Sequence, residues 1–426
     1  MTPREHLQGF VYDSRIITGG YFPSDPLPVA AGDSVGVVLF NTGGPSKPSE
    51  VFSFLYNIFM DPALIRRPRS ASVRHVVSRL LARQLAKSIK RQYKAIGGRS
   101  PINKLTGEQV RALEQTLNDR YGAAAGVTFR TYIATRYGHP SSEEAAKKMQ
   151  ADGVDKVMLL PLYPHYSASS SGSSLGYWSA LQRTGIIPSW PTTYAFEYAA
   201  HPKYLQAISE RIDQALQRFS RTVRDQVHLV FSAQGTPLRE MKERLDPYCC
   251  LVHSTVHKVM ALRGMDRPFT VAFQGKLGVV DWLYPETPET LERLAREGKR
   301  AVLIIPISYV AENLETVYHL DVKLREQAET LGILHYEVTA GLNCHPLFIE
   351  TLAEVVMSQL SVEGRKGPML FTGQTGAHEA PYALKPLGTR SLCNAELRNT
   401  RCPECTHIIE ARCWKNDVPL PVDTPK

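Results

Sequence analysis

The sequence predicts an α/β protein of two similar lobes, each a doubly wound, Rossmann-like parallel sheet, with a central cleft and a cysteine-containing C-terminal tail. Short apolar runs, each followed directly by turn residues, alternate with segments of helical periodicity. That alternation is typical of parallel sheets covered on both faces. It occurs twice, once in each half of the chain. Because ligands bind beyond the carboxyl ends of such strands, we expect the residues that follow the strands to line the cleft.

The first lobe is expected over residues 34–195, after an irregular N-terminal extension at 1–33 that is rich in Pro and Gly and lacks a clear period. A strand is predicted at 35–40 because a continuous apolar run there ends in Asn41-Thr42-Gly43-Gly44-Pro45. The further strands and the helices of this lobe follow from the same reasoning: strands at 127–134 and 156–162, and helices at 107–120 and 142–151.

The second lobe is expected over residues 196–362, and a C-terminal tail follows at 363–426, where the periodicity fades. Its strands are predicted at 227–233, 269–273 and 301–307, and its helices at 202–219, 288–298 and 313–332.

The composition indicates an ordinary globular protein, since 43% of the 426 residues are hydrophobic and 21% are charged. No run approaches the roughly 18 apolar residues of a membrane-spanning helix. The N-terminus contains Glu5 and Asp13 and lacks an apolar signal core and an Arg- and Ser-rich stretch. We therefore expect a cytoplasmic location.

A basic helix is predicted at 71–95, within a stretch from Arg66 to Arg99 that has eleven Lys and Arg and no Asp or Glu. Its apolar residues fall on one helical face, beginning with Val73 and Val76. Three interpretations stay open: a solvated surface helix, a lip that touches anionic lipid headgroups, or a cationic border that attracts an anionic substrate. Nucleic acid is not expected as a partner because no aromatic residues alternate with the cations.

Four of the seven cysteines lie within 21 residues of the tail: Cys393, Cys402, Cys405 and Cys413. This clustering favours thiolate ligation of a metal in a reducing compartment over disulfides. A two-iron two-sulfur (2Fe-2S) cluster and a structural zinc both fit the spacing, and an unmetallated tail is the remaining alternative.

Two motifs after predicted strands can carry chemistry. The segment 163–175 contains six serines, more than helix capping requires, and small residues let the backbone approach a flat ligand. Glu312, Glu315 and His319 are spaced three and four apart, so they are expected on one face of the last predicted helix. Such a face could bind a metal or transfer protons, since carboxylate and imidazole both suit ferrous iron. It could equally be an ordinary solvent-exposed helix face.

The chain resembles the ferrochelatase family from about Val35 to Val356. No single matching stretch is specific, but seven occur in order: 41–45, 93–102, 136–140, 163–175, 231–233, 274–278 with Trp282, and 314–316. The resemblance implies insertion of ferrous iron, the substrate metal, into a porphyrin such as protoporphyrin IX or coproporphyrin III, as in haem biosynthesis. It implies that Glu315 is the essential carboxylate and that porphyrin contacts come from Tyr93, Ser100, Arg136, Tyr137 and Trp282. In family members whose tail holds a 2Fe-2S cluster, one ligand can come from the serine-rich loop, where this chain has Ala168. All four ligands would then come from the tail cysteines.

The chain departs from the family pattern at the proton- and metal-handling positions. Gln234 replaces the usual histidine after the third strand, and Asn313 replaces a second one. An amide cannot accept a proton at neutral pH, so Gln234 could only form hydrogen bonds or coordinate iron weakly through its carbonyl oxygen. His319 and Lys323 stand where some members have acids.

Three functions follow. The first is a working ferrochelatase in which Glu315 takes protons with help from Glu312, His319 or water. The second is a degenerate homologue that binds porphyrin or haem without metallating it. The third is a related chelatase that loads cobalt or nickel onto a tetrapyrrole. The sequence does not determine which porphyrin is used. A homodimer and a peripheral membrane contact are possible partners that it also leaves open.

Overall fold

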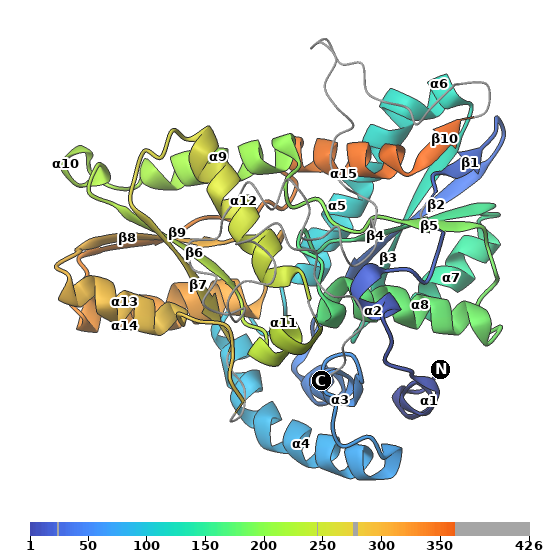
Figure 1. Cartoon of the computed structure of the whole chain (residues 1–426), viewed down its shortest axis with the longest axis horizontal. Helices are drawn as coiled ribbons and strands as arrows, with labels where there is room; N and C mark the ends of the chain where they lie inside the picture. Colours follow the sequence, from blue (N-terminus) through green and yellow to red (C-terminus); the bar gives the residue numbers. More distant parts are fainter. Residues whose placement is uncertain (24, 245, 276–279, 363–426) are drawn as a thin grey trace. The chain divides into compact units, whose positions relative to one another are not determined.

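A computed structural model describes residues 1–362 apart from 24, 245 and 276–279. The tail, with Cys393, Cys402, Cys405 and Cys413, lies outside the described residues. The chain divides into two compact units (Figure 1). Within the described residues, unit 1 comprises Met1–Tyr198 and 343–362, and unit 2 comprises Ala199–Leu342. Each unit is considered by itself, and the expected central cleft stays a prediction.

Unit 1 is built on a four-stranded parallel sheet of order β3-β2-β4-β5. The central strand β2 (Ser34–Asn41) is buried along nearly its whole length, as its continuous apolar run predicts. Its neighbours are β3 (Thr128–Thr135) and β4 (Lys156–Pro161), and β5 (Thr192–Tyr194) forms the edge.

Helices cover both faces of the unit 1 sheet (Figure 1). On one face lie α5 (Ile102–Leu117) and α15 (Pro346–Ser358), which pack against each other. On the other lie α7 (Ser142–Ala151) and α8 (Ser173–Arg183). The start of α7 follows from local chemistry, because Ser141 and Glu144 form a reciprocal capping box.

Unit 2 repeats this topology with a parallel sheet of order β7-β6-β8-β9. The strands are β6 (His228–Gln234), β7 (Phe269–Gln274), β8 (Ala301–Pro306) and β9 (His335–Val338). Helices α9 (Pro202–Leu216) and α12 (Tyr248–Leu262) cover one face, and α13 (Thr287–Arg296) and α14 (Leu324–Thr330) cover the other (Figure 1). The prediction of two similar Rossmann-like lobes is confirmed.

Two predictions about the ends of the lobes need correction. The N-terminal extension is not irregular: it contains α1 (Pro3–Gly9), α2 (Arg15–Thr18) and β1 (Leu27–Val29). Strand β1 pairs in parallel with β10 (Leu360–Val362). Residues 343–362 therefore belong to unit 1, although the sequence analysis placed them in the second lobe. Helical periodicity identifies a buried helix without identifying its partner.

The basic helix α4 covers Ala71–Ala95, the residues predicted, and follows α3 (Val51–Met60), against which it packs. Its small residues Ser78, Ala82 and Ala86 face the protein. The apolar stripe faces outward instead, and Leu80 is 59% exposed. Arg74 is buried rather than solvated, and its Nε donates to the carbonyl oxygen of Pro68 at 2.8 Å.

Several elements have no separate counterpart in the prediction. Strands of three or four residues such as β5 and β9 are too short for a periodic signal. Across the described residues, three π-helices interrupt the regular helices, and such segments are frequent at functional sites. They are η2 (Asn118–Gly122), η3 (Ala168–Gly172) and η4 (Glu315–Lys323). The remaining short elements are η1 (Pro48–Glu50), α6 (Ala123–Ala125), α10 (Arg221–Arg224) and α11 (Leu238–Arg244).

Candidate functional site

The strand order identifies where each unit should bind a ligand. In both four-stranded sheets the strand that comes first in the chain, β2 or β6, lies between the second and the third, so the chain reverses direction across the sheet there. The crevice at the carboxyl ends of those strands is the usual ligand site of open α/β sheets. In unit 1 this is the end of β2 and β4, and in unit 2 the end of β6 and β8.

The glycine-rich turn after β2 lets two segments of unit 1 approach closely. A Cβ on Gly44 would lie 2.5 Å from Cβ and Oγ of Ser100. Ser100 donates its backbone N–H to the carbonyl oxygen of Pro45, and Asn103 Nδ2 donates to the carbonyl oxygen of Gly44. The turn therefore docks the chain that follows α4.

The ends of β2 and β4 are joined by a side-chain hydrogen bond. Thr42 Oγ1 and the Tyr163 hydroxyl are 3.0 Å apart. Burial raises the pKa of Tyr163 to about 12, so the phenol stays protonated at neutral pH. Beside it, Asn41 Nδ2 donates to Thr106 Oγ1 at 2.8 Å.

A buried carboxylate, Asp61, contacts three polar side chains of unit 1, and together they are named here the Asp61 cluster. It directly follows α3 and its side chain is inaccessible to solvent. Arg136 Nη2 lies 3.0 Å from Asp61 Oδ2, to which the Tyr137 hydroxyl and Ser173 Oγ also donate at 2.7 and 2.5 Å. Arg136 Nε donates to Ser173 Oγ at 2.9 Å. Arg136 and Tyr137 were predicted from the sequence as site residues, whereas Asp61 was not.

The Asp61 cluster is electrostatically balanced. Burial alone would raise the pKa of Asp61, but the Arg136 charge and the donated hydrogen bonds lower it overall. The Arg136 guanidinium also lies over two aromatic rings, 5.2 Å from the Tyr137 centroid and 4.3 Å from that of Tyr177. Arg136 is therefore held by a neutralising partner and an aromatic pair rather than left as a free cation.

The other first-lobe residues predicted to contact porphyrin are also buried. Tyr93, in the last turn of α4, and Ser100 are 3% and 4% exposed. In the serine-rich loop, Ala168 packs in an apolar cluster with Ile16 and Ile17 of α2. Position 168 thus has no donor atom and lies beneath the N-terminal segment.

In unit 2, Gln234 ends strand β6 with its side chain exposed. The backbone of Gln234 is fixed on both sides: its N–H donates to Ser308 Oγ, and its carbonyl oxygen accepts from the Tyr248 hydroxyl. The side chain itself has no hydrogen-bond partner among the described residues.

Glu315 begins the π-helix η4. Gln274, which pairs with Gln234 across β6 and β7, donates its Nε2–H to Glu315 Oε2 at 3.3 Å. His319 Nε2 lies 4.0 Å from Glu315 Oε1. The Glu315 side chain is 37% exposed, but the surrounding protein desolvates the carboxylate and raises its pKa. The positive charges of His319 and Lys323 oppose that rise.

Glu312 and Asn313 do not share the face of Glu315 and His319, because the helix begins only at Leu314. Glu312 Oε1 instead accepts the backbone N–H of Gly341 at 2.8 Å, and Oε2 is buried without a partner among the described residues. Asn313 Oδ1 accepts the N–H of Thr316 and so caps the helix start. The expectation of one shared face is correct for Glu315 and His319 and wrong for Glu312.

Trp282 lies beside the loop that follows β6. It forms an isolated bridge with Pro237, and a Cβ on Gly235 would lie 3.2 Å from its ring. The Leu283 N–H donates to the carbonyl oxygen of Thr236, which holds this chain against the strand end. Trp282 is thus close in the fold to Gln234, as its predicted role requires.

No cluster of three or more His, Cys, Asp or Glu side chains suited to a metal is found in the described part of the chain. The described helices include none long and apolar enough to cross a bilayer.

Besides Asp61, Gln274 was not predicted as a site residue from the sequence, although its place at the carboxyl end of a strand marks it as a candidate.

Comparison with known proteins shows one consistent similarity. The sequence model named Ferrochelatase matches residues 34–360. A ferrochelatase of Synechococcus elongatus is 39% identical over 335 residues, covering 76% of this chain and 82% of its own length. One from Gloeobacter violaceus is 37% identical over 332 residues, covering 78% and 99%. The solved structure of SirB from Bacillus subtilis with Fe³⁺ aligns at a TM-score of 0.44 and 11% identity, over 77% of this chain and 96% of that one.

Proposed function

The chain belongs to the ferrochelatase family of metal chelatase enzymes, and on that premise we propose that it inserts ferrous iron into a porphyrin, with Glu315 accepting the pyrrole protons. The product would be haem or its coproporphyrin precursor. The observation that carries this proposal is a carboxylate whose pKa is raised by burial and which accepts a hydrogen bond from Gln274, at the end of strand β7 on the sheet edge where a ligand is expected.

The raised pKa suits Glu315 to the reaction. When iron(II) enters the ring, two N–H protons leave as the pyrrole nitrogens bind the metal. A carboxylate whose pKa lies closer to neutrality takes such protons more readily than an ordinary one, because proton transfer is most efficient when donor and acceptor are matched. Gln274 would hold the carboxylate in place, and His319 can receive a proton from it and release it to water.

Gln234 would act as a weak ligand or hydrogen-bond partner rather than as a base. Its exposed side chain supports this role. Because one acid/base group typically contributes 10²–10⁴-fold, we expect iron insertion to be slower than in a chain with imidazole at that position. Glu312, bound to the Gly341 backbone, would support the loop beside the helix and give at most indirect help.

The proposed porphyrin contacts are Tyr93, Ser100, Arg136, Tyr137 and Trp282. The buried pairing of Arg136 with Asp61 supports a positioning role for that guanidinium, since its charge is already neutralised. Tyr93 and Ser100 would contact the macrocycle only after a local rearrangement, because both are nearly inaccessible in this conformation.

The four tail cysteines Cys393, Cys402, Cys405 and Cys413 would hold a 2Fe-2S cluster, with structural zinc as the alternative. Four thiolates are a complete donor set for either group. The burial of Ala168 among apolar residues supports a ligand set drawn from the tail alone. A bound cluster would supply redox-active iron, and none of the steps above passes through it.

Helix α4 would bring the protein to an anionic membrane surface, as a cytoplasmic protein with peripheral contact. Its exposed apolar stripe and its flanking cations support this, since helices of that composition lie in the interface plane of anionic bilayers. A homodimer remains compatible with the proposal.

The proposal is tested by anaerobic incubation of the protein with ferrous iron and porphyrin, with metalloporphyrin formation followed by its absorption. Glu315→Gln, which cannot accept a proton, should lower the rate at least about 100-fold. Gln234→His should leave it equal or faster. Glu326→Gln, an exposed change in the following helix, is the matched control. A Glu315→Gln protein with full activity would refute the proton-acceptor role.

A further inference from the structure

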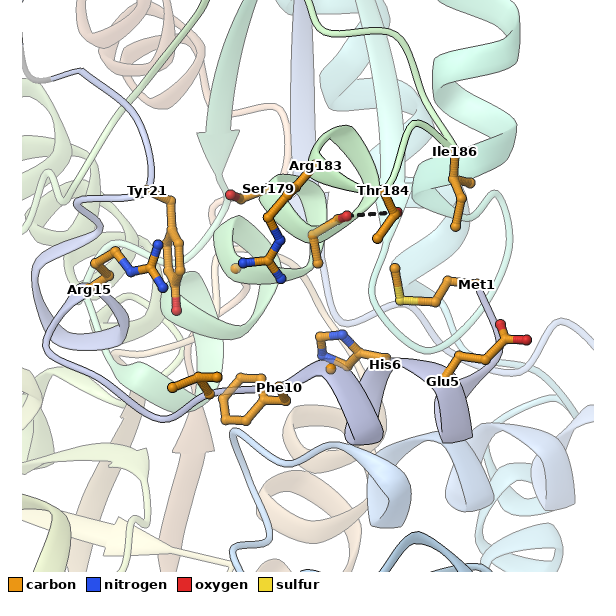
Figure 2. Close-up of a pocket in the computed structure, with 14 residues that line it drawn as sticks. Met1, Glu5, His6, Phe10, Arg15, Tyr21, Ser179, Arg183, Thr184 and Ile186 are labelled. Carbon is orange, nitrogen blue, oxygen red and sulfur yellow. Dashed lines mark hydrogen bonds between the residues drawn. The ribbon is translucent and has the colours of Figure 1, made fainter.

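The N-terminal segment and α8 enclose a cavity of about 260 Å³ in unit 1, named here the N-terminal pocket (Figure 2). Its walls include His6, Phe10, Arg15, Tyr21, Arg183 and Ile186. Residues 1–33 lie outside the part of the chain that matches the ferrochelatase family. The pocket is therefore built in part from a segment that precedes the family-matched residues.

One end of the N-terminal pocket is cationic. Arg15 is already paired, with Nη2 2.6 Å from Asp13 Oδ2 and its guanidinium 5.2 Å from the centroid of Tyr21. Arg183, exposed at the mouth, has neither an ion pair nor a hydrogen bond within the described residues. Figure 2 shows its guanidinium beside Tyr21 and His6. Asp13 lies near enough to interact with the Arg183 charge, but its carboxylate is paired with Arg15. The guanidinium of Arg183 therefore keeps its N–H donors available at the pocket mouth.

The acid in the pocket wall, Glu5, does not meet this charge. Its Oε2 accepts the backbone N–H of Thr2 at 2.8 Å as part of the capping box of α1. In Figure 2 it lies at the opposite end of the pocket from Arg15 and Tyr21. A ligand that pairs with Arg183 would therefore face little repulsion from Glu5, and the negative charge of Asp13 is offset by its ion pair with Arg15.

The rest of the N-terminal pocket is apolar. Phe10, Val11 and Ile186 contribute hydrocarbon surface, and the His6 ring packs edge-on against Phe10 and Tyr177. Burial lowers the pKa of His6 to about 3, so its ring is uncharged at neutral pH. The volume corresponds to roughly nine groups the size of a water molecule. Size and lining together fit a small organic molecule with an apolar body.

We propose that the N-terminal pocket binds a small organic monoanion, such as an aromatic monocarboxylate, with its charge against Arg183 and its apolar body between Phe10 and Ile186. A guanidinium binds a carboxylate through paired N–H donors, which gives the site its preference for an anion. This site uses none of the residues proposed for metal insertion, so its test does not depend on that function.

The test compares benzoate with benzamide, which has the same size and shape without the charge. Ligand-detected NMR on the full chain should show benzoate binding with a dissociation constant of about 0.1–1 mM and benzamide binding at least roughly tenfold more weakly. Arg183→Gln should remove the difference between the two molecules, and Arg183→Lys should keep part of it. Arg111→Gln, an exposed arginine of the same unit outside the pocket, is the control.

Control variants distinguish loss of binding from loss of folding. Arg183 has no bond to lose within the described chain, so Arg183→Gln should melt like the wild type. Val11→Trp, at a wall position that is 66% exposed, should block the pocket and abolish binding of both probes. Equal binding of benzoate and benzamide, an unchanged affinity in Arg183→Gln, or no binding up to about 10 mM would each overturn the proposal.

Discussion

At the scale of single residues, Asp61 and Arg136 are the most strongly constrained pair in unit 1. The Asp61 side chain is inaccessible to solvent and that of Arg136 is only 9% exposed, and each charge is satisfied by the other and by neighbouring hydroxyl groups. Such a pair costs free energy to bury, but removal of one partner costs more, because it leaves the other charge buried alone. The cluster therefore holds Arg136 and Tyr137 in one arrangement beside the strand ends.

Asp61→Asn should lower the free energy of unfolding by about 3 kcal/mol, measured by denaturant titration at pH 7. The pKa of Asp61 is lowered in the folded state, so its ionised form stabilises the folded protein. That contribution to the free energy of unfolding is present above the ordinary carboxyl pKa, and it is lost as the pH falls through the lowered pKa of the folded state. The difference between the two proteins should shrink below about pH 4. Glu108→Gln, whose pair with Lys104 is exposed, should cost less than about 1 kcal/mol. Equal losses in both variants would contradict this account.

Lys323→Gln should move the acid side of the pH–rate profile to higher pH. Burial raises the pKa of Glu315, and the positive charges of His319 and Lys323 pull it down. Removal of the Lys323 charge lets the pKa rise further, so a higher pH is needed to keep Glu315 ionised and able to accept protons. The measurement is kcat/KM against pH. Arg296→Gln, on another exposed helix position, should leave the profile unchanged, and a shift to lower pH in Lys323→Gln would be inconsistent with the charge effect.

Residues that directly follow strands could be found in the sequence, and those held by tertiary packing could not. Gln234 and Glu315 stand near the ends of apolar runs, where the strand rule directs attention. Asp61 follows a helix, and only the fold shows that it meets Arg136 from a segment 75 positions away. Glu312 was misplaced because helical spacing was applied to a residue that precedes the helix.

At the scale of elements, α4 is unusual because its smallest side chains pack inward and its larger apolar ones face outward. Sequence periodicity correctly identified the helix and its apolar stripe, but it could not say which face the rest of unit 1 covers. Ser78, Ala82 and Ala86 let the helix lie close to its neighbours, which leaves Val76 and Leu80 more than half exposed.

The double variant Val76→Asp/Leu80→Asp should bind anionic phospholipid vesicles at least about tenfold more weakly, because it removes apolar contact and adds repelled charge. Co-sedimentation with phosphatidylserine-containing vesicles measures this, and zwitterionic vesicles should bind even the wild type poorly. Leu334→Asp changes an equally exposed leucine of unit 2 and serves as control. Failure of the wild-type protein to prefer anionic vesicles would argue against a membrane role.

At the scale of the whole molecule, the two sheets could be predicted because their central strands are buried on both faces and read as unbroken apolar runs. The short edge strands and the return of residues 343–362 to unit 1 could not, because they depend on partners distant in the sequence. Membership of the ferrochelatase family was predicted from several weak motifs in a consistent order, and the family match over residues 34–360 confirms that membership.

The purified full chain should absorb visible light and bleach on reduction with dithionite, because a 2Fe-2S cluster has charge-transfer bands that zinc lacks. Cys402→Ser and Cys405→Ser should each remove that absorption, whereas Cys344→Ser, which changes an exposed free cysteine of the described chain, should keep it. A colourless protein with about one zinc per chain by elemental analysis would identify the zinc alternative instead.

Because α15 and β10 complete unit 1 only after the whole of unit 2, the order of synthesis matters for this chain. A nascent chain emerging from the ribosome would present α5 without its covering helix for roughly 7–30 s while residues 199–342 are made, at ordinary elongation rates. Unit 2, whose strands are contiguous, can close first, and the N-terminal half must wait with apolar surface uncovered. Chaperone dependence during translation is therefore expected to concentrate on the first 198 residues.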